Sequence, residues 1–129
     1  MVTGIEHVGI CAKDTVALKD WYMKVFGEKI VYDNGKNPPT FFVALADNSM
    51  LEVYPAMKEG TGAQDANIVS GIRHISISVD DFENDVQRFI DAGAQVVIPA
   101  SEKNGVSTFF FRDPEGNIFH FIKREKPLI

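Results

Sequence analysis

The chain has a single cysteine and no long hydrophobic run. Cys11 cannot form a disulfide within the chain, which fits a reducing compartment. No apolar segment approaches the roughly 18 residues that a membrane-spanning helix needs, and the N-terminal residues lack the basic, apolar and small-residue layout of a signal peptide. We therefore expect a cytoplasmic protein that does not associate with a membrane.

Positive charge is also scarce in this chain. Its 129 residues include 13 Lys and Arg against 18 Asp and Glu, which gives a net charge of −5. An acidic balance argues against nucleic acid or an anionic membrane surface as the main partner. The hydrophobic content of 45% is ordinary for a soluble globular protein.

The most informative pattern is an internal repeat. Residues 4–10 read Gly-Ile-Glu-His-Val-Gly-Ile, and residues 71–77 read Gly-Ile-Arg-His-Ile-Ser-Ile. Each copy places a histidine, His7 or His74, inside an alternating run that is typical of a strand. The offset between the copies is about half of the chain, which indicates two copies of one supersecondary unit.

The hydrophobic periodicity predicts the same order of elements in both halves, a strand, a helix and three further strands. An aspartate that can cap the helix follows the first strand of each half, and a glycine ends each helix. The predicted strands are 4–12, 28–33, 40–46 and 50–55 in the first half and 72–79, 94–99, 106–112 and 118–123 in the second, with helices between Asp14 and Gly27 and between Asp81 and Gly93.

The fold class predicted from this order is α+β, with two βαβββ modules. The modules cover residues 1–55 and 71–125, and residues 56–70 form a linker with few large apolar groups. We expect both modules to belong to a single domain over residues 1–129, because each half is too small to build a full core alone.

Four residues of metal-ligating type occupy related positions in these strands. Side chains alternate along a strand, so His7 and His74 lie on the face opposite the apolar set. Glu52 interrupts an apolar strand, and His120 follows it at an offset that matches the main repeat to within one position. Three imidazoles and one carboxylate suit Zn²⁺, Ni²⁺, Co²⁺ or Fe²⁺. The sequence therefore predicts one metal site from His7, Glu52, His74 and His120, on four strands around one cavity.

Each of these residues also has a structural interpretation. A single histidine in a strand is usually a hydrogen-bonded core residue, so the metal interpretation depends on the combination of all four. Met50 and Tyr54 share the face of Glu52 and are candidate pocket walls or core residues. One of the phenylalanines at 109–111 must face the same side, whereas Cys11 is interpreted as a small filler rather than a nucleophile.

Five short motifs support a more specific interpretation. They are Ile5-x-His7, Trp21-Tyr22-x-x-Val25-Phe26-Gly27, Leu51-Glu52-Val53, Gly71-Ile72-Arg73-His74-Ile75 and Asp113-Pro114-Glu115-Gly116-Asn117. With these motifs, essentially the whole chain resembles the vicinal oxygen chelate superfamily. That group includes glyoxalase I, methylmalonyl-CoA epimerase, fosfomycin-resistance proteins, extradiol dioxygenases and bleomycin-resistance proteins.

The resemblance implies paired βαβββ modules that form a cupped, barrel-like mixed sheet with the helices outside. It also implies one divalent metal ion, preferably Zn²⁺, held by the strands at the centre. The ligands of glyoxalase I come from the first, fourth, fifth and eighth strands, and they match His7, Glu52, His74 and His120. Glyoxalases usually have a glutamate in the last of these places, where it is thought to act as a base. The catalytic base here is therefore expected to be Glu52 or His120.

The function that the resemblance implies is that of a metal-dependent lyase or isomerase of the glyoxalase I type. Its small substrate would bind the ion through two adjacent oxygens. Cys11 and Ala56 stand where glutathione-dependent glyoxalases carry an arginine and an asparagine, so glutathione is not the expected thiol. The alternatives are an Fe²⁺ extradiol-type dioxygenase and a drug-binding protein of the bleomycin-resistance type. Exposed sheet edges also predict a homodimer.

Overall fold

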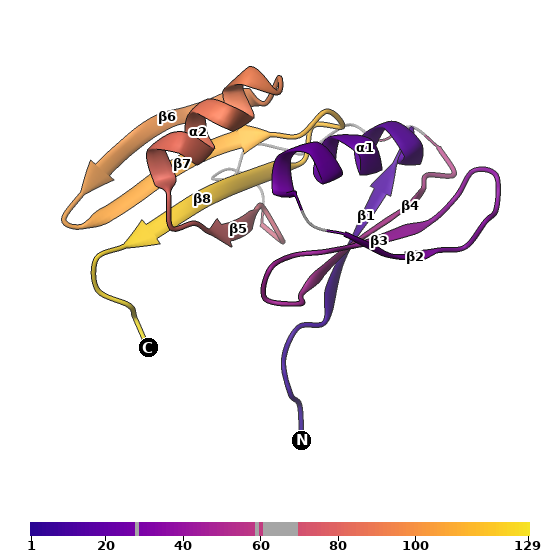
Figure 1. Ribbon diagram of the computed structural model, residues 1–129, viewed down its shortest axis with the longest axis horizontal. Coiled ribbons are helices and arrows are strands. Elements are labelled where there is room, and N and C mark those ends of the chain that lie inside the picture. Colours follow the sequence, from indigo (N-terminus) through magenta and orange to yellow (C-terminus); the bar gives the residue numbers. More distant parts are fainter. Residues whose placement is uncertain (28, 59, 61–69) are drawn as a thin grey trace. The chain divides into compact units, whose positions relative to one another are not determined.

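The computed structural model describes residues 1–27, 29–58, 60 and 70–129. Its elements follow the order βαβββ twice (Figure 1). The chain separates into two compact units, Met1–Gly60 and Thr61–Ile129. Most of the predicted linker, 56–70, lies outside the described residues.

The first unit contains one helix and one open sheet of four strands. β1 pairs in parallel with β4, whereas the β4–β3 and β3–β2 pairs are antiparallel, which gives the order β1-β4-β3-β2. The elements are β1 (His7–Ala12), α1 (Thr15–Phe26), β2 (Ile30–Asp33), β3 (Phe41–Ala44) and β4 (Met50–Pro55).

Helix α1 begins and ends where its capping residues predict. The Ala17 N–H donates to Asp14 Oδ1 over 2.9 Å, so the aspartate satisfies one of the free amides of the first turn. Gly27 adopts a left-handed conformation with φ 70° and donates its N–H to the carbonyl of Met23, which ends the helix. Both capping predictions are confirmed.

The core of the first unit lies between α1 and one face of its sheet. Leu18 and Tyr22 of α1 are buried, as are Ile10 of β1 and Val53 of β4. The neighbouring side chains on β1 alternate, so His7, Gly9 and Cys11 are exposed on the other face. This face carries the candidate site, as the alternation predicted.

The second unit repeats this plan with the sheet order β5-β8-β7-β6. β5 pairs in parallel with β8, and the β8–β7 and β7–β6 pairs are antiparallel. The elements are β5 (Ile75–Ser78), α2 (Phe82–Asp91), β6 (Gln95–Lys103), β7 (Val106–Arg112) and β8 (Ile118–Arg124).

The core of this unit is aromatic. Phe89 of α2 packs against Phe111 and Phe121, with ring centroids 5.2 Å and 4.6 Å apart. Phe109 and Phe119 stack on Phe111, and all five rings are almost fully buried. Even-numbered residues of β8, including His120, therefore belong to the opposite face of the sheet.

Strand β5 is shorter than the predicted strand 72–79. Its ladder with β8 begins at the pair Ile75–Phe119, so His74 precedes the strand instead of lying within it. Gly71 has φ 118°, a conformation that turns the chain just before this point. The predicted start of this strand at residue 72 is therefore wrong by three positions, and His74 is not central in it.

Strand β6 is longer than the predicted strand 94–99. Its pairing with β7 shifts register between Ile98 and Ser101, and this irregularity accommodates Pro99 within an edge strand. Pairing then continues to a tight turn at Asn104 and Gly105, both of which have positive φ. Asn-Gly is a dipeptide that two-residue hairpin turns favour, because both positions need positive φ.

The cap of α2 also differs from the prediction. Asp81 occupies the N-cap position, but its side chain makes no capping hydrogen bond to the backbone. Its Oδ2 instead accepts a hydrogen bond from Asn84 Nδ2 over 3.0 Å. The aspartate thus marks the helix start without satisfying a free backbone amide.

The α+β class and the two βαβββ modules are confirmed. Each unit forms an open four-stranded mixed sheet, and neither sheet closes on itself into a barrel. In the part of the chain that the structure describes, neither helix has the length and apolar character to cross a membrane. A single domain over residues 1–129 stays a prediction.

Candidate metal centre

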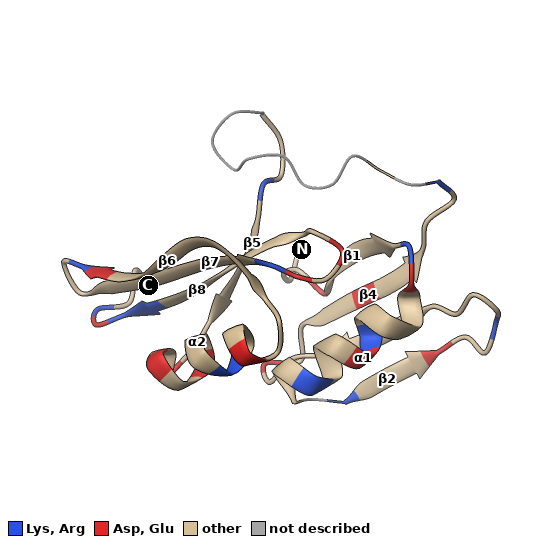
Figure 2. Ribbon diagram, turned by 90° about the horizontal axis from the view of Figure 1, so that it is seen from above, with Lys and Arg blue, Asp and Glu red and all other residues tan. Residues whose placement is uncertain are grey.

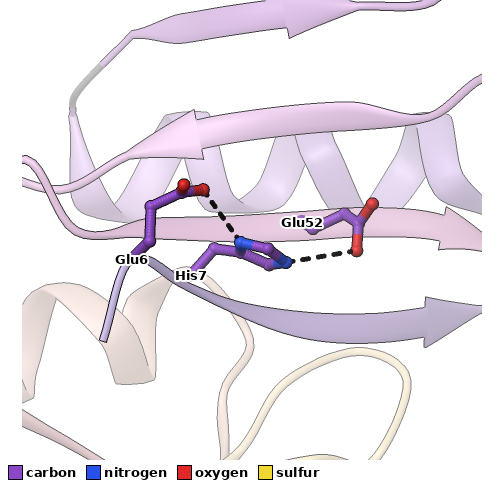
Figure 3. Close-up of polar contacts among 3 residues, drawn as sticks. All are labelled: Glu6, His7 and Glu52. Atoms are coloured by element: carbon purple, nitrogen blue, oxygen red, sulfur yellow. Dashed lines mark hydrogen bonds and ion pairs between the residues drawn. The ribbon is translucent and has the colours of Figure 1, made fainter. Parts of the chain in front are cut away.

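The first unit brings His7 and Glu52 together. Glu52 is the one charged residue of β4, and an acidic segment interrupts that strand in Figure 2. The parallel ladder pairs Gly9 of β1 with Glu52, so His7 lies one pleat away on the same face. His7 Nε2 and Glu52 Oε1 are 3.8 Å apart (Figure 3). Two ligands of one ion at about 2.1 Å lie about 3.0–3.4 Å apart, so a small side-chain rotation would bring this pair into coordination range.

Gly9 leaves the space that this pair needs. A Cβ atom at this position would crowd the ring of Tyr54, at 3.2 Å from its Cε1, and would touch Glu52 Oε1 at 3.4 Å. On another strand of the sheet, Phe42 presents its ring to His7 in an edge-on contact, with centroids 5.2 Å apart. Phe42 and Gly9 therefore confine the imidazole and the carboxylate to one patch of the sheet.

The second unit brings His74 and His120 together. Their ring centroids are 4.6 Å apart. Phe110, which pairs with His120 across β7 and β8, contacts the rings of His120 and His74 at 4.4 Å and 5.5 Å. His120 is only 8% exposed, whereas His74, just before β5, is exposed. The phenylalanine predicted to face the site is thus Phe110.

The two ring nitrogens of His120 have different surroundings. Nε2 lies 2.6 Å from the hydroxyl of Ser76, its cross-strand neighbour on β5. Nδ1 is buried without a hydrogen-bond partner among the described residues. Burial, with smaller contributions from the charges of His74 and Arg124, lowers the pKa of His120 to about 4. This imidazole is therefore neutral at pH 7, the form in which a histidine binds metal.

The repeat extends to these side-chain contacts. Phe42 and Phe110 are separated by the same offset as Glu52 and His120, and each packs edge-on against the first histidine of its own unit. Gly9 and Ser76 are separated by the same offset as His7 and His74. Gly9 pairs with Glu52 on β4, and Ser76 pairs with His120 on β8. The roles of Phe42 and Ser76 were not predicted, although the repeat spacing points to both residues.

The structure thus places the four predicted ligands as two pairs, one in each unit. Across residues 1–27, 29–58, 60 and 70–129, no group of three or more His, Cys, Asp or Glu converges. Two ligands do not hold a structural or catalytic metal ion, which requires three or four. Each pair supplies two of the four donors of the predicted site. A metal site made of all four residues, His7, Glu52, His74 and His120, stays a prediction.

The burial of His120 predicts an acid-sensitive fold. Its pKa is about 4 in the folded protein against a usual 6.5, so the unfolded chain binds the proton more strongly between these values. The stability that neutral His120 contributes is complete above pH 6.5 and is lost as the pH falls towards 4. Between pH 7 and pH 5, the loss is at most about 2 kcal/mol, and solvent screening reduces it.

This loss is measured by urea unfolding of the metal-free protein at pH 7 and pH 5. We expect His120→Gln to lose less stability over this interval than the wild type, because glutamine does not titrate. His7 and His74 are common to both proteins and cancel in the comparison. Equal losses in the two proteins would contradict the assignment to His120.

Comparisons with known proteins place this geometry in a family. The model of the Glyoxalase/Bleomycin resistance protein/Dioxygenase superfamily matches residues 4–121. No curated protein matches this chain. Several solved structures share the fold at low sequence identity.

A glyoxalase family protein from Enterococcus faecalis is 21% identical, with a TM-score of 0.75, and the match covers 93% of this chain and 97% of that one. A mutant of the fosfomycin resistance protein FosX from Listeria monocytogenes, complexed with Mn(II) and 1S,2S-dihydroxypropylphosphonic acid, is 15% identical at a TM-score of 0.75 and coverages of 99% and 96%. A glyoxalase/dioxygenase from Nostoc punctiforme is 12% identical at a TM-score of 0.81 and coverages of 95% and 92%. With the family model matched over nearly its whole length, the chain belongs to the Glyoxalase/Bleomycin resistance protein/Dioxygenase superfamily.

Proposed function

We propose that this protein is a metal-dependent lyase or isomerase of the glyoxalase I type, with one divalent ion bound by His7, Glu52, His74 and His120. The observation that carries the proposal is the pairing of ligand-type side chains at repeat-related places, His7 with Glu52 and His74 with His120. Two isolated structural histidines would have no reason to recur beside a second donor in both units. The proposal requires both pairs to reach one ion, within one chain or between two chains.

The donor set favours a borderline divalent ion, with Zn²⁺ as the first choice. When bound, such an ion supplies Lewis-acid stabilisation of negative charge on the oxygens of a substrate. His120 is neutral at pH 7, and the imidazole of His7 approaches Glu52 through Nε2. The low pKa makes His120 a weak base at pH 7 and leaves a lone pair free to bind a metal, so His120 suits the ligand role better than that of a base.

Glu52 is the better candidate for proton transfer. Its carboxylate has two oxygens, so one oxygen can accept a proton while the other remains engaged. Its side chain is 26% exposed, which leaves an oxygen accessible to a substrate. Phe42 is its cross-strand partner on β3. In this proposal Glu52 removes a proton from a carbon next to a carbonyl and returns it to the adjacent carbon.

The metal assignment predicts about one divalent ion per chain. His7→Ala and His74→Ala should each abolish tight binding, because either change removes one of the four donors that the proposed site uses. Metal analysis after gel filtration, with calorimetric titration of Zn²⁺ into the metal-free protein, measures this. Cys11→Ser is the matched control, since Cys11 shares the exposed face of β1 with His7 and should not affect binding. Stoichiometric metal in the His7→Ala, His74→Ala double variant would refute the assignment.

The catalytic role of Glu52 predicts a separation of turnover from metal binding. Glu52→Gln keeps an oxygen ligand but removes the basic carboxylate, so turnover should fall by about 10²–10⁴-fold while metal is largely retained. A screen of α-ketoaldehydes with different thiols supplies the substrate, and glutathione is not expected to be the best thiol. Near-normal turnover by Glu52→Gln, beside an inactive but metal-loaded His120→Gln, would assign the base to His120. Oxygen uptake by the iron-loaded protein would instead indicate a dioxygenase.

We also propose that the protein is a homodimer. The edge strand β2 exposes three large apolar side chains at 30–32, and the edge strand β6 exposes three at 96–98, of which Ile98 is 45% exposed. Exposed apolar edges favour pairing with a second copy. Light scattering should give about twice the chain mass of 14.3 kDa. Ile98→Lys should shift the protein towards the monomer, whereas Val16→Lys on α1, also 45% exposed, should not. A monomeric wild type at micromolar concentration would reject this proposal.

A further inference from the structure

Glu6, His7 and Glu52 form a continuous polar chain in the first unit (Figure 3). His7 Nδ1 lies 3.0 Å from Glu6 Oε1, and His7 Nε2 lies 3.8 Å from Glu52 Oε1. The backbone of Glu6 is fixed to the sheet, because the Met50 N–H donates to its carbonyl over 3.0 Å. Glu6 therefore contacts His7 from a defined place at the start of β1.

The first of these contacts, in which the Glu6 side chain is 73% exposed, favours one tautomer of His7. An ionised carboxylate only accepts hydrogen bonds, so Nδ1 must carry the proton that it donates to Glu6. A neutral imidazole protonated on Nδ1 has its free lone pair on Nε2. Glu52, 3.8 Å away, has no proton to donate as a carboxylate, so that lone pair stays free.

We propose that Glu6 is a positioning residue that holds His7 in the Nδ1–H tautomer and so prepares Nε2, beside Glu52, to bind a divalent cation. The inference rests on the proposed function for its metal. Carboxylates that accept from the outer nitrogen of a histidine fix the ring orientation and raise the basicity of the inner nitrogen. Glu6 is not itself a ligand in this arrangement, because its carboxylate lies against the opposite ring nitrogen.

The repeat supplies an internal comparison. Arg73 stands in the place of Glu6, since each residue immediately precedes the first histidine of its unit. A guanidinium only donates hydrogen bonds, so Arg73 cannot accept the Nδ1 proton of a histidine. The carboxylate support is therefore specific to His7, and a change at Glu6 should leave His74 unaffected.

The tautomer is measured directly by long-range ¹H–¹⁵N NMR on the metal-free protein at pH 8. The chain has only three histidines, so single His→Gln variants assign every imidazole signal. We expect His7 to be protonated on Nδ1 in the wild type and to shift towards the Nε2–H tautomer in Glu6→Ala, with His74 and His120 unchanged. Glu6→Gln retains an acceptor oxygen and should keep most of the Nδ1–H form. A wild-type His7 protonated on Nε2, or a tautomer that does not respond to Glu6→Ala, would overturn the inference.

The consequence for metal binding is measured separately by Zn²⁺ titration. Glu6→Ala should weaken binding by about 10–100-fold, with a smaller loss in Glu6→Gln. Glu83→Ala, which removes an equal charge from an exposed position on α2, should leave the affinity unchanged. Unchanged Zn²⁺ affinity in Glu6→Ala would overturn the positioning role. A wild type that binds no metal would refute the proposed function, and the tautomer experiment on the metal-free protein would still decide the coupling of Glu6 to His7.

Discussion

The parallel pairing of the first and last strands of each module is the constraint on which the candidate site depends. In the first unit β1, the strand before the helix, pairs with β4, the last strand of the module. In the second unit β5 pairs with β8 in the same way. Parallel strands in register place every second residue of both on one face. The helix covers one face of the sheet, so the polar residues that interrupt the apolar pattern must gather on the other. His7 and Glu52 meet for this reason, whereas His74 lies just before the β5–β8 ladder and contacts the ring of His120 from there.

Much of this could be predicted from the sequence, because the relevant signals are local or repeated. The helix of the first module was delimited by Asp14 and Gly27, whose capping chemistry acts within one turn. The faces of β1 followed from simple alternation. The start of β5 could not be predicted, because it depends on where the ladder with β8 begins. The alternating sequence pattern also gives no sign of the positive φ of Gly71. The register shift around Pro99 could not be predicted either, because a proline is tolerated there only since β6 is an edge strand.

The residues of the candidate site could be predicted from the sequence more readily than the contacts between them. The ligand-type residues stood out because a charged or polar side chain in an apolar strand needs a partner. Glu6 and Ser76 did not stand out, because a glutamate and a serine near a strand end are ordinary surface residues. Their hydrogen bonds to His7 and His120 become apparent only in the structure, which shows where the ring nitrogens of the two histidines point. The same repeat spacing that revealed the histidines would nevertheless have singled out Phe42, whose counterpart is Phe110.

The two modules share a scaffold but differ in the chemistry around each pair. Gly9 leaves room for the carboxylate of Glu52, whereas Ser76, in the matching place, fills the space and contacts His120 Nε2. One pair is therefore half-exposed and carries a negative charge, whereas the other contains a buried, neutral imidazole. A duplicated unit with two identical pairs would give only one kind of environment. The exchange of Glu52 for His120, together with that of Gly9 for Ser76, therefore places a carboxylate in one module and a buried, neutral imidazole in the other.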